Sequence, residues 1–312
     1  MELISVIVPC LNEEAAIEIF YNEFFETVEK FSIPVKYEVI FVDDGSTDRT
    51  LSVMKSLSRQ DKRVHYISFS RNFGKEGAML AGLRAAKGDF VTMMDVDLQD
   101  PPSLIEEMYK ILKTGEYDCA AARRGDRKGE GKMRSFLSNR FYSFINKMSD
   151  TEFVKGARDF RLMTRRMVNS VLELTEYNRF SKGIFSWVGY RTKWITYENI
   201  ERSAGETKWG IKGLFKYSIE GIMAFSTKPL AFASFLGILC LLLALLFIAV
   251  IIAKTLIWGD PVAGYPSLIC VILFIGGLQL FTIGIAGQYI AKTYLEVKKR
   301  PIYITKESDL IK

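Results

Sequence analysis

Residues 90–97 read FVTMMDVD, an apolar run that ends in two aspartates, Asp95 and Asp97. The apolar part, residues 90–94, has the length and composition of a buried β-strand. In extended backbone, residues two apart point to the same side, so both carboxylates can face one site. Oxygen ligands of this kind suit Mg²⁺ or Mn²⁺, above all where a diphosphate supplies further oxygens. A bare Asp-x-Asp also commonly caps a helix, so the position at the strand end carries the prediction of a metal site.

The same kind of strand recurs on both sides of this stretch. Helix patterns separate the strands, and Pro101 and Pro102 open the last helix of the series. The expected strands are residues 3–9, 37–42, 64–69, 90–94 and 117–122, and the expected helices are residues 13–31, 47–59 and 75–86. Such alternation predicts an open, mostly parallel α/β sheet with flanking helices. Ligands bind at the carboxyl ends of the strands in sheets of this type.

Two uncharged runs follow this region. One has 25 residues between Lys228 and Lys254, and the other has 31 between Asp260 and Lys292. Since about 20 apolar residues span a bilayer as a helix, we expect a transmembrane hairpin with spans at about 230–253 and 267–291. Lysines and arginines gather outside the hairpin ends, which predicts that both termini are cytoplasmic. Amphipathic patterns at residues 133–148 and 207–228 favour helices at or near the lipid surface, or ordinary domain helices.

Composition excludes several classes of protein. The net charge of +6 lies mostly beside the apolar runs, which favours a membrane surface over nucleic acid as the partner. The four cysteines form no CxxC pair, so zinc and a disulfide framework are not expected. His65 is the only histidine, and we interpret it as a packed strand residue. Acid–base and metal chemistry must therefore come from carboxylates. The absence of GxGxxG and P-loop motifs weighs against dinucleotide redox enzymes and P-loop ATPases.

Residues 41–48, FVDDGSTD, form a second strand-to-helix junction with polar side chains. Gly45 permits a tight turn, and Ser46 or Thr47 can cap the next helix. A plain turn needs no ligand. In the functional interpretation, a carboxylate accepts the N3–H of uracil while N–H groups at the helix start hold polar ligand atoms. The glycines of residues 72–77, NFGKEG, would allow close backbone approach nearby.

Four segments, in this order and spacing, resemble family 2 glycosyltransferases with a GT-A fold over roughly the first 210 residues. They are residues 5–14 (SVIVPCLNEE), 43–46 (DDGS), 71–74 (RNFG) and 95–102 (DVDLQDPP). The DLQxPP pattern with two C-terminal spans is similar to polyprenyl-phosphate glycosyltransferases, a group that includes bactoprenol glucosyltransferases and dolichyl-phosphate mannose synthases. Residues 156–163, GARDFRLM, resemble the bactoprenol branch most closely.

The resemblance implies roles for individual residues. Asp159 would be the catalytic base, although a lipid phosphate has a second pKa of about 6 and scarcely needs deprotonation. Asp159 would otherwise orient the acceptor, complete the ion's shell or be structural. Arg202 and Lys208 would contact phosphates. The divalent ion, Mg²⁺ or Mn²⁺, would be held by Asp97, Asp95 and Gln99, and the nucleotide sugar by Pro9, Asn12, Glu13, Asp44, Ser46, Lys75 and Asp95.

The expected activity is inverting transfer of a sugar, glucose from UDP-glucose, to a polyprenyl phosphate at the cytoplasmic membrane face. GDP-mannose, UDP-GlcNAc or a UDP-amino-sugar are alternative donors. A processive polysaccharide synthase, a non-catalytic membrane adaptor and a transporter are further alternatives. We expect a catalytic domain at residues 1–206, a juxtamembrane segment at 207–228, the two spans within 229–291 and a basic cytoplasmic tail at 292–312. The resemblance suggests a homotetramer, and no nucleic-acid partner is expected.

Overall fold

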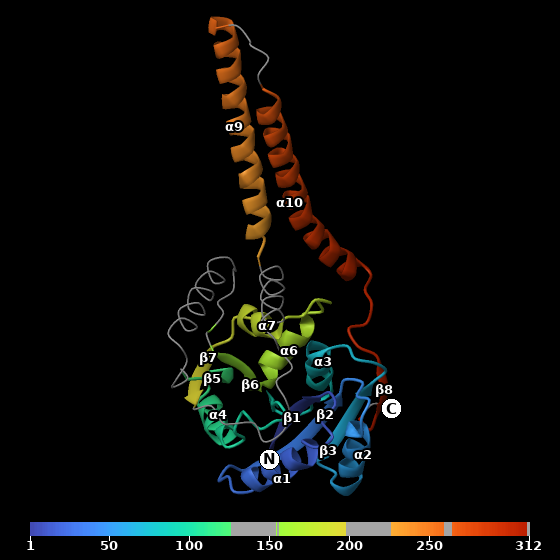
Figure 1. Ribbon diagram of the computed structural model, residues 1–312. Helices are drawn as coiled ribbons and strands as arrows, with labels where there is room; N and C mark the ends of the chain where they lie inside the picture. The colour runs from blue at the N-terminus through green and yellow to red at the C-terminus, as the bar shows by residue number, and fades with distance from the viewer. Residues whose placement is uncertain (126–153, 155, 198–225, 259–263, 311–312) are drawn as a thin grey trace.

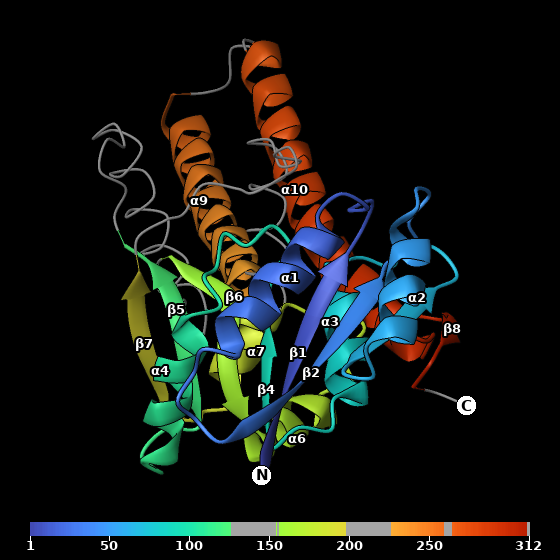
Figure 2. The ribbon, with the colours of Figure 1, turned by 90° about the horizontal axis from the view of Figure 1, so that it is seen from below.

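The computed structural model describes residues 1–125, 154, 156–197, 226–258 and 264–310 (Figure 1). One mixed sheet forms the centre, and helices cover both of its faces (Figure 2). Two long apolar helices leave this α/β domain together on one side (Figure 1). The expected α/β fold with a C-terminal helical hairpin is confirmed.

The sheet has eight strands in the order β7-β5-β6-β4-β1-β2-β3-β8. All five predicted strands are present, within two residues at each end. The bounds are β1 (Glu2–Cys10), β2 (Val35–Asp43), β3 (Val64–Phe69), β4 (Phe90–Met93), β5 (Cys119–Arg124), β6 (Ala157–Thr164), β7 (Thr192–Tyr197) and β8 (Thr305–Ser308). Parallel pairs join β1 to β2 and β4, β2 to β3, and β5 to β7. The three strands that sequence did not predict, β6, β7 and β8, include the two that pair antiparallel, β6 with β4 and β5 and β8 with β3.

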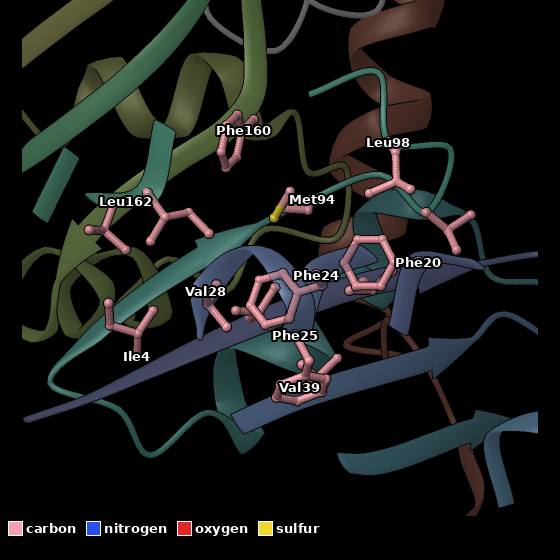
Figure 3. Packing of buried hydrophobic residues seen from close by; sticks show 14 of the residues in the cluster. Ile4, Phe20, Phe24, Phe25, Val28, Val39, Met94, Leu98, Phe160 and Leu162 are labelled. Carbon is pink, nitrogen blue, oxygen red and sulfur yellow. The ribbon is translucent and has the colours of Figure 1, made fainter. Parts of the chain in front are cut away.

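Two hydrophobic layers hold the helices to the sheet. On one face, aromatic side chains of α1 pack on β1 and β2, with Phe20 and Phe24 fully buried (Figure 3). Along β1, Ile4, Val6 and Val8 point to this face while Ile7 points to the other, as strand alternation requires. The helices of the first face are α1 (Ile17–Val28), α2 (Thr50–Gln60) and α4 (Leu104–Lys113), and those of the second are α3 (Lys75–Ala85), α6 (Arg165–Glu173) and α7 (Ser181–Trp187).

The helix predicted to open at two prolines is α4, but it begins at Leu104. Pro101 and Pro102 lie in the turn before it, where their carbonyls accept the N–H groups of Leu104 (3.2 Å) and Ile105 (3.0 Å). The prolines therefore precede the helix, and their carbonyls accept the first free N–H groups of α4.

The apolar runs form α9 (Lys228–Trp258) and α10 (Tyr265–Val297), both longer than expected. By length and composition, Lys228–Phe247 and Phe274–Val297 are apolar enough to cross a membrane. After α10 the chain returns to the α/β domain and adds β8 to the edge of the sheet (Figure 1). The predicted helices at residues 133–148 and 207–228 lie outside the described residues.

Candidate active site

The loops that follow β1 and β2 are joined by hydrogen bonds. The amide of Asn12 donates to Ser46 Oγ (2.9 Å), and Asn12 Oδ1 accepts the amide of Thr47 (2.8 Å). The amide of Glu13 donates to Thr50 Oγ1 (2.8 Å) at the start of α2. Asn12 adopts φ 55°, a conformation that asparagine tolerates better than most residues. These bonds bring three predicted nucleotide-binding residues, Asn12, Glu13 and Ser46, to one edge of the sheet.

Asp44 joins this pair of loops to the loop before α3. Its carboxylate accepts the amides of Phe73 (2.6 Å) and Gly74 (2.9 and 3.1 Å), and its side chain is buried. Burial raises the pKa of Asp44 above its ordinary value, although the two amide donors oppose this effect. Much of the acceptor capacity of Asp44 is therefore used within the protein. Its expected contact with a nucleobase stays a prediction.

Lys75 lies between two carboxylates at the start of α3. Its Nζ is 2.6 Å from Asp95 Oδ1 and 2.8 Å from Asp159 Oδ2. The three side chains come from α3, the end of β4 and β6, so only the folded sheet brings them together. Burial opposes the charge on Lys75, but Asp159 and Asp95 raise its pKa above the ordinary value for lysine. A single cation thus links the predicted metal motif to the predicted catalytic aspartate.

Asp159 is strongly held in its charged form. Burial alone would raise its pKa, but attraction to Lys75 and Lys182 outweighs burial and holds the pKa well below the usual range. A carboxylate with so low a pKa is a poor proton acceptor near pH 7, because its conjugate acid is too strong. The ion pair with Lys75 suits the alternative of an orienting group, and the expected role of Asp159 as catalytic base stays a prediction.

Asp97 and Gln99 lie in the turn beyond Asp95. Asp97 Oδ1 accepts the amide of Gln99 (3.2 Å), and the intervening Leu98 has φ 55°. The Gln99 side-chain oxygen accepts Nη2 of Arg124 (2.8 Å) and Nη2 of Arg158 (3.1 Å). The side-chain oxygen of Gln99 therefore already accepts hydrogen bonds from two guanidinium groups, and its expected metal contact stays a prediction.

Arg124 and Arg158, which no sequence motif singled out, lie beside Gln99. Arg158 also donates to buried Asp100 through Nε (3.3 Å), and Asp100 accepts the Tyr197 hydroxyl as well. Within the described residues, Arg124 Nε is buried with no hydrogen-bond partner. One sequence signal could have pointed to Arg158, since it directly precedes Asp159. Together the two arginines place positive charge beside the predicted metal motif.

The described residues contain no group of three or more His, Cys, Asp or Glu side chains arranged to hold a metal ion. Asp95 and Asp97 nevertheless fit one mode of binding. Mg²⁺ commonly takes one or two protein carboxylates and completes its shell with substrate phosphates and water. A site built on these two carboxylates would need phosphate oxygens and water to complete the shell of the ion. Arg202 and Lys208, the predicted phosphate contacts, lie outside the described residues, and Pro9 lies in β1 beside Val42 of β2.

The site connects to the base of α10 through a short segment of chain. Glu76, next to Lys75, accepts the amide of Ser181 with both oxygens at 3.0 Å, and also its hydroxyl. Just before Ser181, the amides of Tyr177 (2.8 Å) and Asn178 (3.3 Å) donate to Glu296 near the end of α10. Residues 177–181 thus contact both the start of α3 and the last turns of an apolar helix.

Comparison with known proteins identifies the family. Residues 5–172 match the model for glycosyl transferase family 2. The chain is 44% identical over 308 residues to the putative glycosyltransferase CsbB of Bacillus subtilis, covering 99% of this chain and 92% of that protein. It is 43% identical over 307 residues to the SfII prophage-derived bactoprenol glucosyl transferase of Shigella flexneri, covering 98% of each. The chain therefore belongs to glycosyltransferase family 2, and it is a glycosyltransferase.

A solved structure, mannosyltransferase PcManGT from Pyrobaculum calidifontis in complex with GDP-Man and Mn²⁺, aligns with a TM-score of 0.47 at 19% identity. The alignment covers 95% of this chain and 88% of that one. A likeness this distant adds nothing to the assignment, which rests on the family match and the sequence relatives.

Proposed function

We propose that the protein transfers glucose from UDP-glucose to a polyprenyl phosphate, with inversion at the anomeric carbon, at the cytoplasmic face of a membrane. The observation that carries the proposal is the connection between the Lys75 site and α10 through residues 177–181. A sugar-transfer site next to the end of an apolar helix suits an acceptor whose head group lies at the membrane surface. A relative that is 43% identical over almost its whole length is named a bactoprenol glucosyl transferase, which supports both the lipid and the sugar.

The residues of the site support this chemistry without a protein base. A phosphate monoester is largely ionised at pH 7, so its oxygen can attack without losing a proton to Asp159. Lys75 helps to keep Asp159 charged and bridges its carboxylate to that of Asp95. Arg124 and Arg158 supply planar guanidinium groups, which suit phosphate oxygens of donor or acceptor. We propose that Asp159 orients the acceptor together with Lys75.

A divalent cation, Mg²⁺ or Mn²⁺, would be held by Asp95 and Asp97 together with phosphate oxygens of the donor. When bound, it would neutralise negative charge on the UDP leaving group. Asp97 accepts an amide from its own turn, and this bond fixes the position of the carboxylate before any ligand binds.

The arrangement of charge supports the proposed membrane topology. Lys228 stands at the start of α9, while Lys298, Lys299 and Arg300 follow α10. Basic residues at these two ends favour a cytoplasmic position for both. We propose residues 1–206 as the catalytic domain, 207–228 as a juxtamembrane segment and the spans within 229–291. The tail at 292–312 begins within α10 and contributes β8 to the catalytic domain.

The test is transfer of radiolabelled glucose from UDP-glucose to polyprenyl phosphate in vesicles with Mg²⁺, followed by lipid extraction. The label should enter the lipid fraction with the wild-type protein and be lost with Asp97→Ala. Glu23→Ala, at an exposed position on α1, is the matched control and should retain activity. GDP-mannose and UDP-GlcNAc are tested in parallel. Labelling from one of these instead would replace glucose in the proposal, and no labelling from any donor would refute lipid transfer.

A further inference from the structure

The part of the C-terminal tail that follows α10, residues 298–310, binds back onto the catalytic domain, and "tail" below means these residues. Its strand β8 pairs antiparallel with β3, and the amide of Ser70 donates to the carbonyl of Ile304 (3.0 Å) just before the paired residues. The edge of the sheet next to β3 is therefore covered by residues that follow the apolar helices. The sequence alone indicated only a basic extension here.

Asp309 makes the densest set of polar contacts in the tail. Its Oδ1 accepts the amide of Tyr66 (2.8 Å), and its Oδ2 accepts the hydroxyl of Ser58 (2.8 Å) and lies 2.9 Å from His65 Nδ1. One side chain thus reaches both β3 and α2. The single histidine of the chain lies in β3, as expected of a strand residue, and its ring nitrogen contacts this carboxylate.

Three further contacts hold the tail along its length. Glu307 pairs with Lys55 of α2 at 2.5 Å, and both side chains are about one-third exposed. Tyr303 stacks on Phe69 at the end of β3, with ring centroids 5.0 Å apart and planes 15° from parallel. Arg84 of α3 also lies over the Tyr303 ring, 5.6 Å from its centroid. The interaction therefore combines main-chain pairing, charge and aromatic packing.

The tail also lies against the helix that carries Lys75. A Cβ atom placed on Gly77 of α3 would be 3.8 Å from the carbonyl oxygen of Ile302 and 3.9 Å from its side chain. Gly77 is two residues from Lys75 on the same helix. The tail therefore joins the end of α10 to the element that positions the central cation of the site.

We propose that this tail is a second tether, which fixes the orientation of the catalytic site relative to the apolar helices so that it can reach an acceptor embedded in a bilayer. The inference rests on the proposed function. A domain attached to a membrane hairpin through one connection can rotate about it, whereas a second attachment, at the β3 edge of the sheet, restricts that rotation. Holding reactants in a fixed mutual geometry raises the rate of their reaction. Tyr303, Glu307 and Asp309 are thus positioning residues and touch no substrate.

The test uses the full-length protein in vesicles with two acceptors, polyprenyl phosphate within the bilayer and water-soluble citronellyl phosphate. The variant Glu307→Lys with Asp309→Lys places positive charge against Lys55 and His65. We expect it to lower transfer to polyprenyl phosphate by about fivefold or more, because the acceptor is less often in reach. Transfer to citronellyl phosphate should stay within about twofold of wild type, because the site itself is unchanged.

Hydrogen exchange reports the docking independently of activity. The amides of Tyr66 and Ser70 donate to the tail, so their exchange should accelerate in the double variant. Glu307→Lys alone should show a smaller effect, and adding Lys55→Glu should reverse it by restoring an opposite-charge pair. Lys110→Glu, which breaks an exposed pair with Glu106 on α4, is the matched control and should change neither measurement.

Four results would overturn the proposal. Unchanged exchange at Tyr66 and Ser70 would show that the tail does not dock as described. Faster exchange with unchanged transfer to both acceptors would show that docking has no role in reaching the lipid. An equal loss with both acceptors would indicate a purely structural role. If wild type transfers sugar to neither acceptor, the proposed function fails and the tether to a lipid acceptor fails with it, while the exchange data still report whether the tail docks.

Discussion

Replacing Gly45 by alanine tests whether the turn after β2 positions the loop before α3. Gly45 has φ +74°, and a Cβ added to it would lie 2.4 Å from the carbonyl carbon of Arg71 and 2.7 Å from the amide nitrogen of Asn72. Both are backbone atoms, so no side-chain rotation relieves the clash. The loop around residue 71 must move, and this movement would strain the hydrogen bonds that Asp44 accepts from Phe73 and Gly74.

Two contributions make up the expected loss of stability. A left-handed conformation costs a residue with a Cβ about 1–2 kcal/mol. Forcing an extra carbon into a closely packed region costs about 1–3 kcal/mol more. Gly115 separates the two, because it has φ +76° with no atom within 4 Å of the added Cβ. We therefore expect Gly115→Ala to lose only the first contribution, about 1–2 kcal/mol, and Gly45→Ala to lose about 2–5 kcal/mol.

The assay is thermal unfolding of both variants in the same detergent, combined with calorimetric titration of UDP-glucose. For a domain of this size, each kcal/mol lowers the midpoint of unfolding by about 2–4 °C. Gly45→Ala should also bind the donor more weakly, since the displaced loop leads directly into Lys75. Equal midpoints for Gly45→Ala and Gly115→Ala, with unchanged donor affinity, would refute the role of this close approach.

Three other changes test the site and the domain. Lys75→Met should weaken binding of UDP-glucose by about tenfold or more in calorimetry, because Asp95 and Asp159 then repel the diphosphate without a neighbouring cation. Lys75→Arg keeps the positive charge and should retain part of the affinity. Full affinity in Lys75→Met would contradict the role of the Lys75 cation in donor binding. Asp97→Asn should weaken Mn²⁺ binding in the presence of UDP, measured by the paramagnetic resonance of free Mn²⁺, and unchanged binding would remove Asp97 from the metal site. A hydrogen bond from Arg63 lowers the pKa of Asp61 below its ordinary value of 3.8, so stability is present above that pH and is lost as the pH falls through the lower folded-state pKa. Asp61→Asn should flatten this acid limb of the unfolding free energy, and an unchanged slope below pH 4 would contradict the assignment.

Local patterns predicted the core of the fold because each buried strand carries its own apolar run. The five predicted strands and the helices between them are present, as are two apolar helices. The patterns missed β6, β7 and β8. The strand β8 has the sequence TKES, without an apolar run, and it forms only because β3 offers an unpaired edge and Asp309 binds the Tyr66 amide. Its strand character comes from its partner.

The site likewise combines residues that the sequence singled out with contacts that only the fold makes. Sequence placed Asp95 at a strand end and singled out Lys75 and Asp159 separately. Lys75 was expected to contact the nucleotide sugar, and Asp159 to be a base, an orienting group, a metal-shell residue or a structural residue. Nothing in the spacing of residues 75, 95 and 159 indicates that one ammonium group contacts both carboxylates. That contact depends on antiparallel pairing of β6 with β4, which brings residue 159 to the strand end that carries Asp95.

The sequence by itself determined the alternation of strands and helices, the carboxylates at the strand ends, the two apolar helices and the family. These features depend on local composition, periodicity and motif order, which the chain carries before it folds. Only the tertiary structure decided that Lys75 links Asp95 to Asp159. It also decided that Arg124 and Arg158 donate hydrogen bonds to Gln99, and that the C-terminal tail pairs with β3. The physical reason is that such contacts join residues from 20 to more than 200 positions apart, and their energy exists only once the sheet holds those residues within a few ångströms.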